Sequence, residues 1–289
     1  MLAVSLDRSR YPMLNDAQFK QVVSLAYVHW GLDIPDRKRT LVDNRISKLL
    51  ANSQQENIED LLEASVKTED GMLKLFDVLS TNFTGFFREK DHFDCIEKEI
   101  LIPAINGERG NGRKLRFWSA ACSNGSEAYT LGTVIHDHLP HIGGWDVRIL
   151  ATDLSESALE EARKATYSRK VLHDIPADCL EKHFDVTPEA VTVKRHVRDL
   201  VTLGQVNLVG PWPMQGPFDA IFCRNVMIYF DTPTRDKLCN RLRSLLCEDG
   251  LLFIGSSESL VGQLNGLHII RPGVYRKVPM TTSQRREAS

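Results

Sequence analysis

RFWSAACSNGSEAYTLGTVIHDH, residues 116–138, passes from a short apolar run into a helical pattern. The apolar beginning predicts a strand at Arg116–Ser119, and the end predicts a helix at Glu127–His138. Between them lie small residues and Gly125, which let the backbone approach a ligand closely. In open α/β sheets ligands bind beyond the carboxyl ends of the strands, so this turn is a candidate site. An ordinary strand-to-helix turn is the alternative, because the GxGxxG pattern is absent.

Strand and helix signals continue to alternate through the second half of the chain. The further elements expected there are strands at Val147–Asp153, Phe218–Cys223 and Leu251–Gly255, and helices at Ser155–Ala165 and Pro233–Cys247. This alternation predicts a mostly parallel sheet covered by helices on both faces. Two short strands near Leu267–Ile270 and Val274–Val278 predict an antiparallel hairpin at the sheet edge.

The regions outside this alternation have different patterns. Residues 14–105 carry helix-period signals with little strand signal, and Asp16 is a candidate cap for the first helix. The strand-period stretch VTVKRHVRDLVTL predicts small antiparallel strands inserted into the α/β region. The expected organisation is a helical domain at 1–88, an α/β domain at 89–280 with the β insertion at about 185–205, and a disordered tail at 281–289.

Composition excludes several classes of protein. The chain has 289 residues, with 36 Lys and Arg against 38 Asp and Glu, which argues against binding nucleic acid by bulk charge. No run of 18 or more apolar residues predicts a membrane span, and the start MLAVSLDRSRYPMLND is not a secretory signal. Six scattered cysteines without a CxxC pair favour reduced thiols over a disulfide framework or a zinc site. A soluble intracellular protein without a metal is therefore expected.

Polar residues that follow the predicted strands are candidates for ligand binding. Asp153 ends the second strand, where a carboxylate can accept hydrogen bonds from both ribose hydroxyls of a nucleotide. Helix capping is its alternative role, although Ser155 is better placed for that. Arg224 and Asn225 follow the strand Phe218–Cys223 and can line a pocket, or Arg224 can make a structural ion pair.

A further polar group lies upstream in TNFTGFFRE, residues 81–89, where Asn82, Thr84 and Arg88 are set among three phenylalanines. Their spacing does not place all three on one helix face. The segment is either an irregular turn that wraps a ligand or a buried linker between the helical and α/β regions.

Taken together and in order, these segments resemble the chemotaxis receptor glutamate O-methyltransferases of the CheR type. The matching segments are TNFTGFFRE (81–89), RFWSAACSNGSEAYTLG (116–132), ILATDLSESALEEAR (149–163), GPFDAIFCRNVMIYFD (216–231) and DGLLFIGSSES (249–259). The resemblance covers roughly residues 15–280. Many family members read STGEEPYS where this chain has SNGSEAYT, so Ser126 replaces a glutamate and Ala128 a proline.

The resemblance implies a class I methyltransferase (Rossmann-like) sheet with an N-terminal all-helical domain and a small inserted antiparallel β-subdomain. It also implies S-adenosyl-L-methionine as cofactor and S-adenosyl-L-homocysteine as product. The residues implied to bind the cofactor are Asn82, Thr84, Arg88, Glu127, Asp153, Asn207, Leu208, Arg224 and Asn225. Arg88 and Tyr229 are the implied catalytic residues, with Tyr229 near the sulfonium methyl group.

The implied reaction forms methyl esters on glutamate side chains in the cytoplasmic domains of methyl-accepting chemotaxis receptors, by a cytoplasmic monomer. Lys38, Arg45 and Lys48 share one face of a predicted helix and form a candidate docking stripe for an acidic receptor helix. The inserted strands can dock a receptor tail peptide in family members, but residues 184–190 here lack the glycine that some members have. The alternatives are a methyltransferase with another acceptor, a sensor that binds the cofactor without transfer, and a nicotinamide-dependent oxidoreductase, which the missing GxGxxG disfavours.

Overall fold

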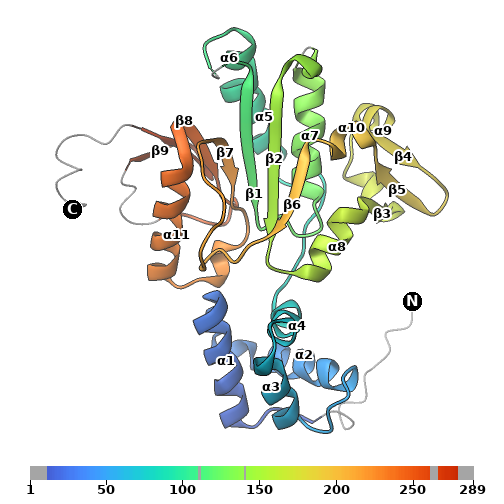
Figure 1. Cartoon of the computed structure of the whole chain (residues 1–289), viewed down its shortest axis with the longest axis vertical. Coiled ribbons are helices and arrows are strands. Elements are labelled where there is room, and N and C mark those ends of the chain that lie inside the picture. The colour runs from blue at the N-terminus through green and yellow to red at the C-terminus, as the bar shows by residue number, and fades with distance from the viewer. Residues whose placement is uncertain (1–11, 110–111, 140, 261–265, 279–289) are drawn as a thin grey trace. The chain divides into compact units, whose positions relative to one another are not determined.

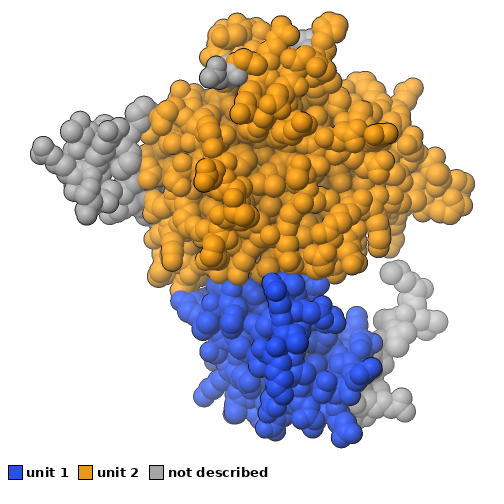
Figure 2. Space-filling model, viewed as in Figure 1, with its two compact units in different colours: residues 1–81 blue, residues 82–289 orange. Residues whose placement is uncertain are grey.

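The computed structural model describes residues 12–109, 112–139, 141–260 and 266–278 (Figure 1). The chain forms two compact units, residues 1–81 and 82–289, which Figure 2 distinguishes by colour. Residues 82–88, which sequence analysis assigned to the helical domain, therefore group with the second unit. The tail expected at 281–289 lies outside the described residues.

The described part of the first unit is helical. Its elements are α1 (Asp16–Trp30), the short 3-10 helix η2 (Asp36–Lys38), α2 (Arg39–Ala51), α3 (Ile58–Lys67) and α4 (Glu69–Leu79). The apolar positions of these helices recur at helical spacing, and Val22, Ile46 and Leu75 are fully buried between them. Asn15 rather than Asp16 caps α1, because the Asn15 side chain accepts from the backbone of Gln18 while the Gln18 side chain accepts from Asn15.

The prediction that Lys38, Arg45 and Lys48 share one helix is wrong for Lys38, which is half-buried in η2, and the two residues on α2 are only partly available to a partner. Arg45 is half-buried and donates to the carbonyl oxygens of Leu79 and Ser80 at 2.6 and 2.8 Å. Arg45 therefore binds the orphan carbonyl groups at the end of α4. Lys48 is exposed on the same helix.

A seven-stranded sheet forms the centre of the second unit. Its strands are β1 (Lys114–Ala120), β2 (Asp146–Asp153), β6 (Val201–Gln205), β7 (Phe218–Phe222), β8 (Leu246–Phe253), β9 (Leu267–Arg271) and β10 (Val274–Lys277). They lie in the order β6-β2-β1-β7-β8-β10-β9. The five strands from β6 to β8 are parallel, and β10 runs antiparallel to β8 and β9. The prediction of a mostly parallel sheet with an antiparallel edge hairpin is confirmed.

Helices cover this sheet on both faces, with α7 and α8 on one side and α11 on the other (Figure 1). The helical segments are α5 (Lys90–Ile96), the π-helical turn η3 (Glu97–Leu101), α6 (Ile102–Ile105), α7 (Ser126–His138), η4 (Ile142–Gly144), α8 (Glu156–Lys164), η6 (Met227–Tyr229) and α11 (Thr232–Leu245). In the core the Phe222 ring stacks on Phe253 at 4.4 Å and on Phe93 of α5 at 5.7 Å. These contacts fix the start of α5 against the middle of the sheet.

A small antiparallel sheet is inserted between β2 and β6. Its strands, in the order β3-β5-β4, are β3 (Thr166–Ser168), β4 (Phe184–Val186) and β5 (Ala190–Val193), with η5 (Arg169–His173), α9 (Ala177–His183) and α10 (Arg195–Arg198) around them. The insertion begins earlier than the expected 185 and ends before 205. Of the stretch VTVKRHVRDLVTL, only the first part pairs in the small sheet, whereas Val201–Gln205 joins β2 as the edge strand β6 of the large sheet.

No helix within the described ranges is long and apolar enough to span a membrane. All six cysteines are free thiols.

Candidate functional site

Four parallel strands of the second unit end at the same edge of the sheet. β1 ends at Ala120, β2 at Asp153, β6 at Gln205 and β7 at Phe222. Parallel strands bring the residues that follow them together at one edge, where ligands of open α/β sheets bind. Six of the residues predicted from the sequence lie at or after the ends of these strands: Glu127, Asp153, Asn207, Leu208, Arg224 and Asn225.

The segment that precedes α5 is an irregular turn held by aromatic contacts. Phe86 is buried and lies edge-on to Tyr167 and Phe184 of the small sheet, with ring centroids 4.9 and 5.3 Å apart. The backbone N–H of Phe87 donates to Thr130 Oγ1 of α7 at 3.1 Å. Phe87 and Glu89 both have positive φ angles, 51° and 55°, which breaks any helix before Lys90. The burial of Phe86 is the physical reason that residues 82–88 belong with the second unit.

A buried arginine joins three of the segments at this edge. The Arg224 side chain is 2% exposed and lies between two carboxylates, with Nη1 3.3 Å from Glu127 Oε2 and Nη2 3.4 Å from Glu89 Oε2. Arg224 Nη2 also donates to the carbonyl oxygen of Arg88. Arg224 therefore connects the turn after β7 with the start of α7 and with the segment before α5.

The two carboxylates beside Arg224 differ in their electrostatics. Burial raises the pKa of Glu127, and the Arg224 guanidinium and the Ser119 hydroxyl, which donates to Glu127 Oε1 at 2.6 Å, oppose that rise. Burial also acts to raise the pKa of Glu89, but Arg224 and the N–H of Ser256 outweigh it and hold the pKa below its usual range. Glu127 is the carboxylate whose charge is less well compensated.

Asp153 holds the turns at the ends of β1 and β2. Its Oδ2 accepts from the N–H of Ser123 at 2.8 Å, and its Oδ1 accepts from the N–H of Ser155 at 2.9 Å. Ser155 caps α8 through its own side chain, so the capping alternative for Asp153 is not required. Asn82 reaches the same turns, because its Nδ2 donates to Ser155 Oγ at 3.2 Å and its carbonyl oxygen accepts from Ser123 Oγ at 3.2 Å.

Asn207 and Leu208 lie after β6, in a loop fixed by α11 and an aromatic ring. The carbonyl oxygen of Asn207 accepts from Trp212 Nε1, and that of Leu208 accepts from Arg241 Nη1. The Arg241 guanidinium lies 3.7 Å from the centroid of the Trp212 ring. These contacts order the loop that follows β6.

The remaining predicted residues are arranged less closely. Arg88 turns back on its own segment, with Nη1 donating to the carbonyl oxygen of Phe83 at 3.0 Å. Tyr229 ends the short helix η6, and Thr84 is half-buried in the irregular turn before α5. The structure therefore brings Arg88, Glu127 and Arg224 together, and separately Asn82 and Asp153.

Two carboxylates at this edge, Glu89 and Glu258, were not predicted from the sequence. Glu89 is the last letter of TNFTGFFRE and pairs with Arg224, while Glu258 lies in DGLLFIGSSES and accepts from the backbone of Asn225 at 2.8 Å. Both residues lie in segments that carry the resemblance to the CheR-type methyltransferases. Their acidic side chains within these segments were the sequence signal that could have identified them as candidate site residues.

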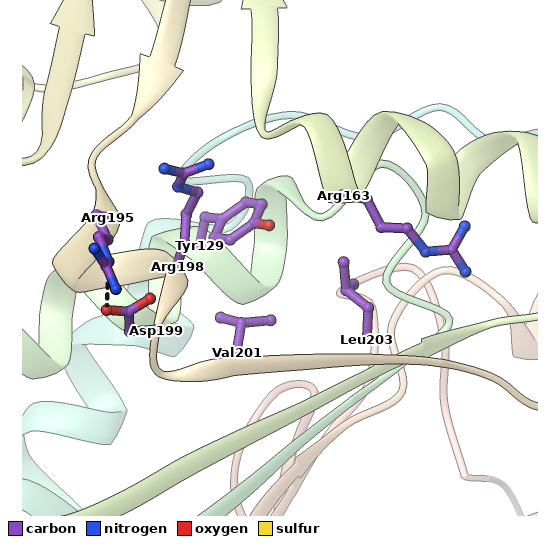
Figure 3. Close-up of a pocket in the computed structure, with 7 residues that line it drawn as sticks. All are labelled: Tyr129, Arg163, Arg195, Arg198, Asp199, Val201 and Leu203. Atoms are coloured by element: carbon purple, nitrogen blue, oxygen red, sulfur yellow. Dashed lines mark ion pairs between the residues drawn. The ribbon is translucent and has the colours of Figure 1, made fainter.

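A pocket of about 510 Å³ lies elsewhere in the second unit (Figure 3). It is lined by Tyr129, Arg163, Arg195, Arg198, Asp199, Val201 and Leu203. Arg163 pairs with Glu156 at 2.6 Å, and Arg195 pairs with Asp199 at 3.4 Å. None of the residues predicted for the cofactor lines this pocket.

Comparisons with known proteins show the family of the chain. Residues 82–273 match the model of a family described as "CheR methyltransferase, SAM binding domain". A chemotaxis protein methyltransferase of Borreliella burgdorferi is 34% identical over 90% of this chain and 94% of its own length. The Escherichia coli chemotaxis protein methyltransferase is 34% identical over 85% of both chains. Among solved structures, a DhpI–SAH complex is 16% identical with a TM-score of 0.32, covering 69% of this chain and 78% of that chain.

The family model covers more than half of the chain, and the candidate carboxylates and arginines all lie within the matched residues. The predicted methyltransferase fold and S-adenosylmethionine dependence are thereby confirmed. The chain belongs to the CheR family of S-adenosylmethionine-dependent chemotaxis protein methyltransferases.

Proposed function

We propose that the protein transfers a methyl group from S-adenosylmethionine to glutamate carboxylates in the cytoplasmic domains of chemotaxis receptors. The observation that carries this proposal is the buried Arg224 between Glu127 and Glu89, at the sheet edge where Asp153 also lies. The protein would act in the cytoplasm as a monomer, with exposed Lys48 of α2 contributing to docking on an acidic receptor helix.

The residues at this edge suit the cofactor. Arg224 Nε is buried without a hydrogen-bond partner among the described residues, and it would donate to the carboxylate of the methionine part. Glu127 would accept from the ammonium group of the same part, since its charge is incompletely balanced by Arg224. Asp153 would accept from the ribose hydroxyls, while Asn207 and Leu208 would flank the adenine.

When bound, S-adenosylmethionine supplies an electrophilic methyl group on a sulfonium centre. The protein needs no general base, because a glutamate carboxyl with a pKa of about 4.3 is already ionised at neutral pH. Its residues have to position the acceptor carboxylate and remove part of its water. Arg88 would orient that carboxylate, and the Tyr229 hydroxyl would donate a hydrogen bond to one of its oxygens.

The decisive assay incubates the full-length chain with methyl-labelled S-adenosylmethionine and a receptor cytoplasmic fragment. We expect base-labile label on receptor glutamates, because methyl esters of glutamate hydrolyse in base. A receptor fragment whose candidate glutamates are replaced by alanine serves as the control. Cofactor binding without label on any receptor fragment would instead identify a sensor.

Arg88→Ala and Tyr229→Phe test the two proposed catalytic residues. We expect each to lower kcat by about tenfold through loss of one charged or polar contact to the acceptor, with little change in S-adenosylhomocysteine affinity for Tyr229→Phe. Steady-state methylation and calorimetric binding measure these two quantities separately. Near-full turnover by both variants would contradict the assignment.

A further inference from the structure

The turn that carries Arg224, Asn225 and Tyr229 is held by a carboxylate from the segment that follows the next strand. Glu258 lies just beyond β8, and its Oε2 accepts from the N–H of Gly255 at 2.6 Å and from the N–H of Asn225 at 2.8 Å. Its Oε1 accepts from the N–H of Ile228 at 3.2 Å. One buried side chain thus satisfies backbone donors at both ends of the turn after β7.

The backbone at this clamp is held in a sterically demanding conformation. Asn225 has a φ angle of 60°, a left-handed conformation that costs energy for a side chain other than glycine. A Cβ atom at Gly255 would lie 2.4 Å from Asn225 Nδ2 and 2.9 Å from Glu258 Oε2, so any other residue there would displace these two side chains. The Glu258 carboxylate bridges the segment after β8 and the turn after β7.

The same loop also supports the partner of Arg224. The N–H of Ser256 donates to Glu89 Oε2 at 3.2 Å, and that oxygen lies 3.4 Å from Arg224 Nη2. Residues 255–258 consequently fix both the backbone that carries Arg224 and one carboxylate that orients its guanidinium.

The position of Glu258 is not explained by a gain in stability alone. Burial raises the pKa of its carboxyl, although the N–H groups of Gly255, Asn225 and Ile228 oppose the rise. A raised pKa in the folded state means that the protonated form of Glu258 is favoured by folding and the charged form is disfavoured. The stability that the protonated form contributes is therefore lost as pH rises through that pKa. The folded chain tolerates this cost at a position that determines the geometry of the turn.

We propose that Glu258 is a positioning residue, which sets the turn at Arg224–Tyr229 for cofactor binding by hydrogen bonds to its backbone. The inference rests on the proposed site at Arg224 and Asn225. Glu258 itself need not contact the cofactor or the acceptor.

Glu258→Gln is the test variant, because it keeps the size of the side chain but removes one acceptor oxygen. In the wild type three backbone N–H groups donate to the two carboxylate oxygens, whereas glutamine offers one oxygen. At least one buried N–H of the turn loses its partner, so we expect S-adenosylhomocysteine to bind about tenfold more weakly. Amide hydrogen exchange at Asn225 and Ile228 should rise by a similar factor without cofactor. Glu248→Gln is the matched control, since Glu248 is 65% exposed on β8 and should change neither readout.

A double-mutant cycle separates positioning from a general loss of stability. Asn225→Gly removes a proposed site side chain and accepts the positive φ angle without strain. We expect Glu258→Gln to have less effect on affinity in that variant than in the wild type, and its full effect in Asp153→Asn. All affinities are measured well below the unfolding temperature of each variant.

Unchanged S-adenosylhomocysteine affinity in Glu258→Gln overturns the proposal, whatever happens to amide exchange. The proposal is also overturned if the double variant loses affinity by the product of the two single fold-changes, because Glu258 and Asn225 would then act independently. Failure of the proposed function looks different: the wild type would then bind S-adenosylhomocysteine but label no receptor. If the wild type binds no S-adenosylhomocysteine, the positioning role is tested by amide exchange alone. Unchanged exchange at Asn225 and Ile228 in Glu258→Gln then overturns that role.

Discussion

Arg224→Ala is expected to lower the free energy of unfolding of the second unit by about 3 to 5 kcal/mol, because it leaves two buried carboxylates without their cation. Arg224 is nearly inaccessible to solvent, and the side chains of Glu127 and Glu89 are only 13% and 18% exposed. Solvent screening therefore does little to relieve their repulsion. Denaturant unfolding followed by far-UV circular dichroism measures the change.

The loss of stability in Arg224→Ala should depend on pH. Without the guanidinium, the folded-state pKa values of Glu127 and Glu89 should both lie above their unfolded values, because burial then dominates. A group with a raised folded-state pKa loses stability as pH rises through that pKa. The deficit relative to the wild type should therefore be larger at pH 8 than at pH 5, where the carboxyl groups begin to bind protons.

Two further variants complete this experiment. Arg148→Ala removes an arginine that is 62% exposed and 3.9 Å from Asp146, so it should leave stability nearly unchanged. Arg224→Lys keeps the charge but cannot bridge both carboxylates, and should fall between the wild type and Arg224→Ala. A pH-independent loss, or one as small as that of Arg148→Ala, would show that Arg224 does not compensate these carboxylates.

The sequence predicted the sheet well because hydrophobic periodicity depends on burial alone. The elements after residue 114 alternate as expected, since the central parallel strands β1 and β7 are buried on both faces and the helices that cover the sheet on one. The assignment of strands to sheets was wrong for the stretch VTVKRHVRDLVTL, whose strand-period pattern continues from the small sheet into the large one. Val191 and Val193 pair in the small sheet, but the chain then turns through α10, and Val201 begins a strand of the large sheet.

The strand-end residues of the candidate site could be named from the sequence, but Glu89, Glu258 and the contacts between the residues could not. Asp153 and Arg224 were found because they follow strands. Which carboxylate Arg224 would contact depends on the positive φ angles of Phe87 and Glu89, which place Glu89 beside it. Neither angle has a sequence signal, because such conformations favour glycine and are held here by the burial of Phe86.

Glu127→Gln should weaken cofactor binding with little change in stability, whereas the expected effect of Arg224→Ala is a large loss of stability. We expect S-adenosylhomocysteine to bind about 10- to 100-fold more weakly, because a charge-assisted hydrogen bond to the ammonium group becomes a neutral one. Isothermal titration calorimetry measures the affinity, with Glu248→Gln as the exposed control. Ser119→Ala keeps the carboxylate and removes only its 2.6 Å hydrogen bond, so its effect should be smaller.

Stability should change by less than about 1 kcal/mol in Glu127→Gln, since the amide removes a charge that burial disfavours and Glu89 still pairs with Arg224. The raised pKa of Glu127 means that its charged form lowers stability as pH increases, so the variant should gain on the wild type between pH 5 and pH 8. A buried carboxylate that costs stability and is needed for affinity belongs to the binding site. Wild-type affinity in Glu127→Gln would instead make Glu127 a structural partner of Arg224, and the ammonium group would have to bind elsewhere.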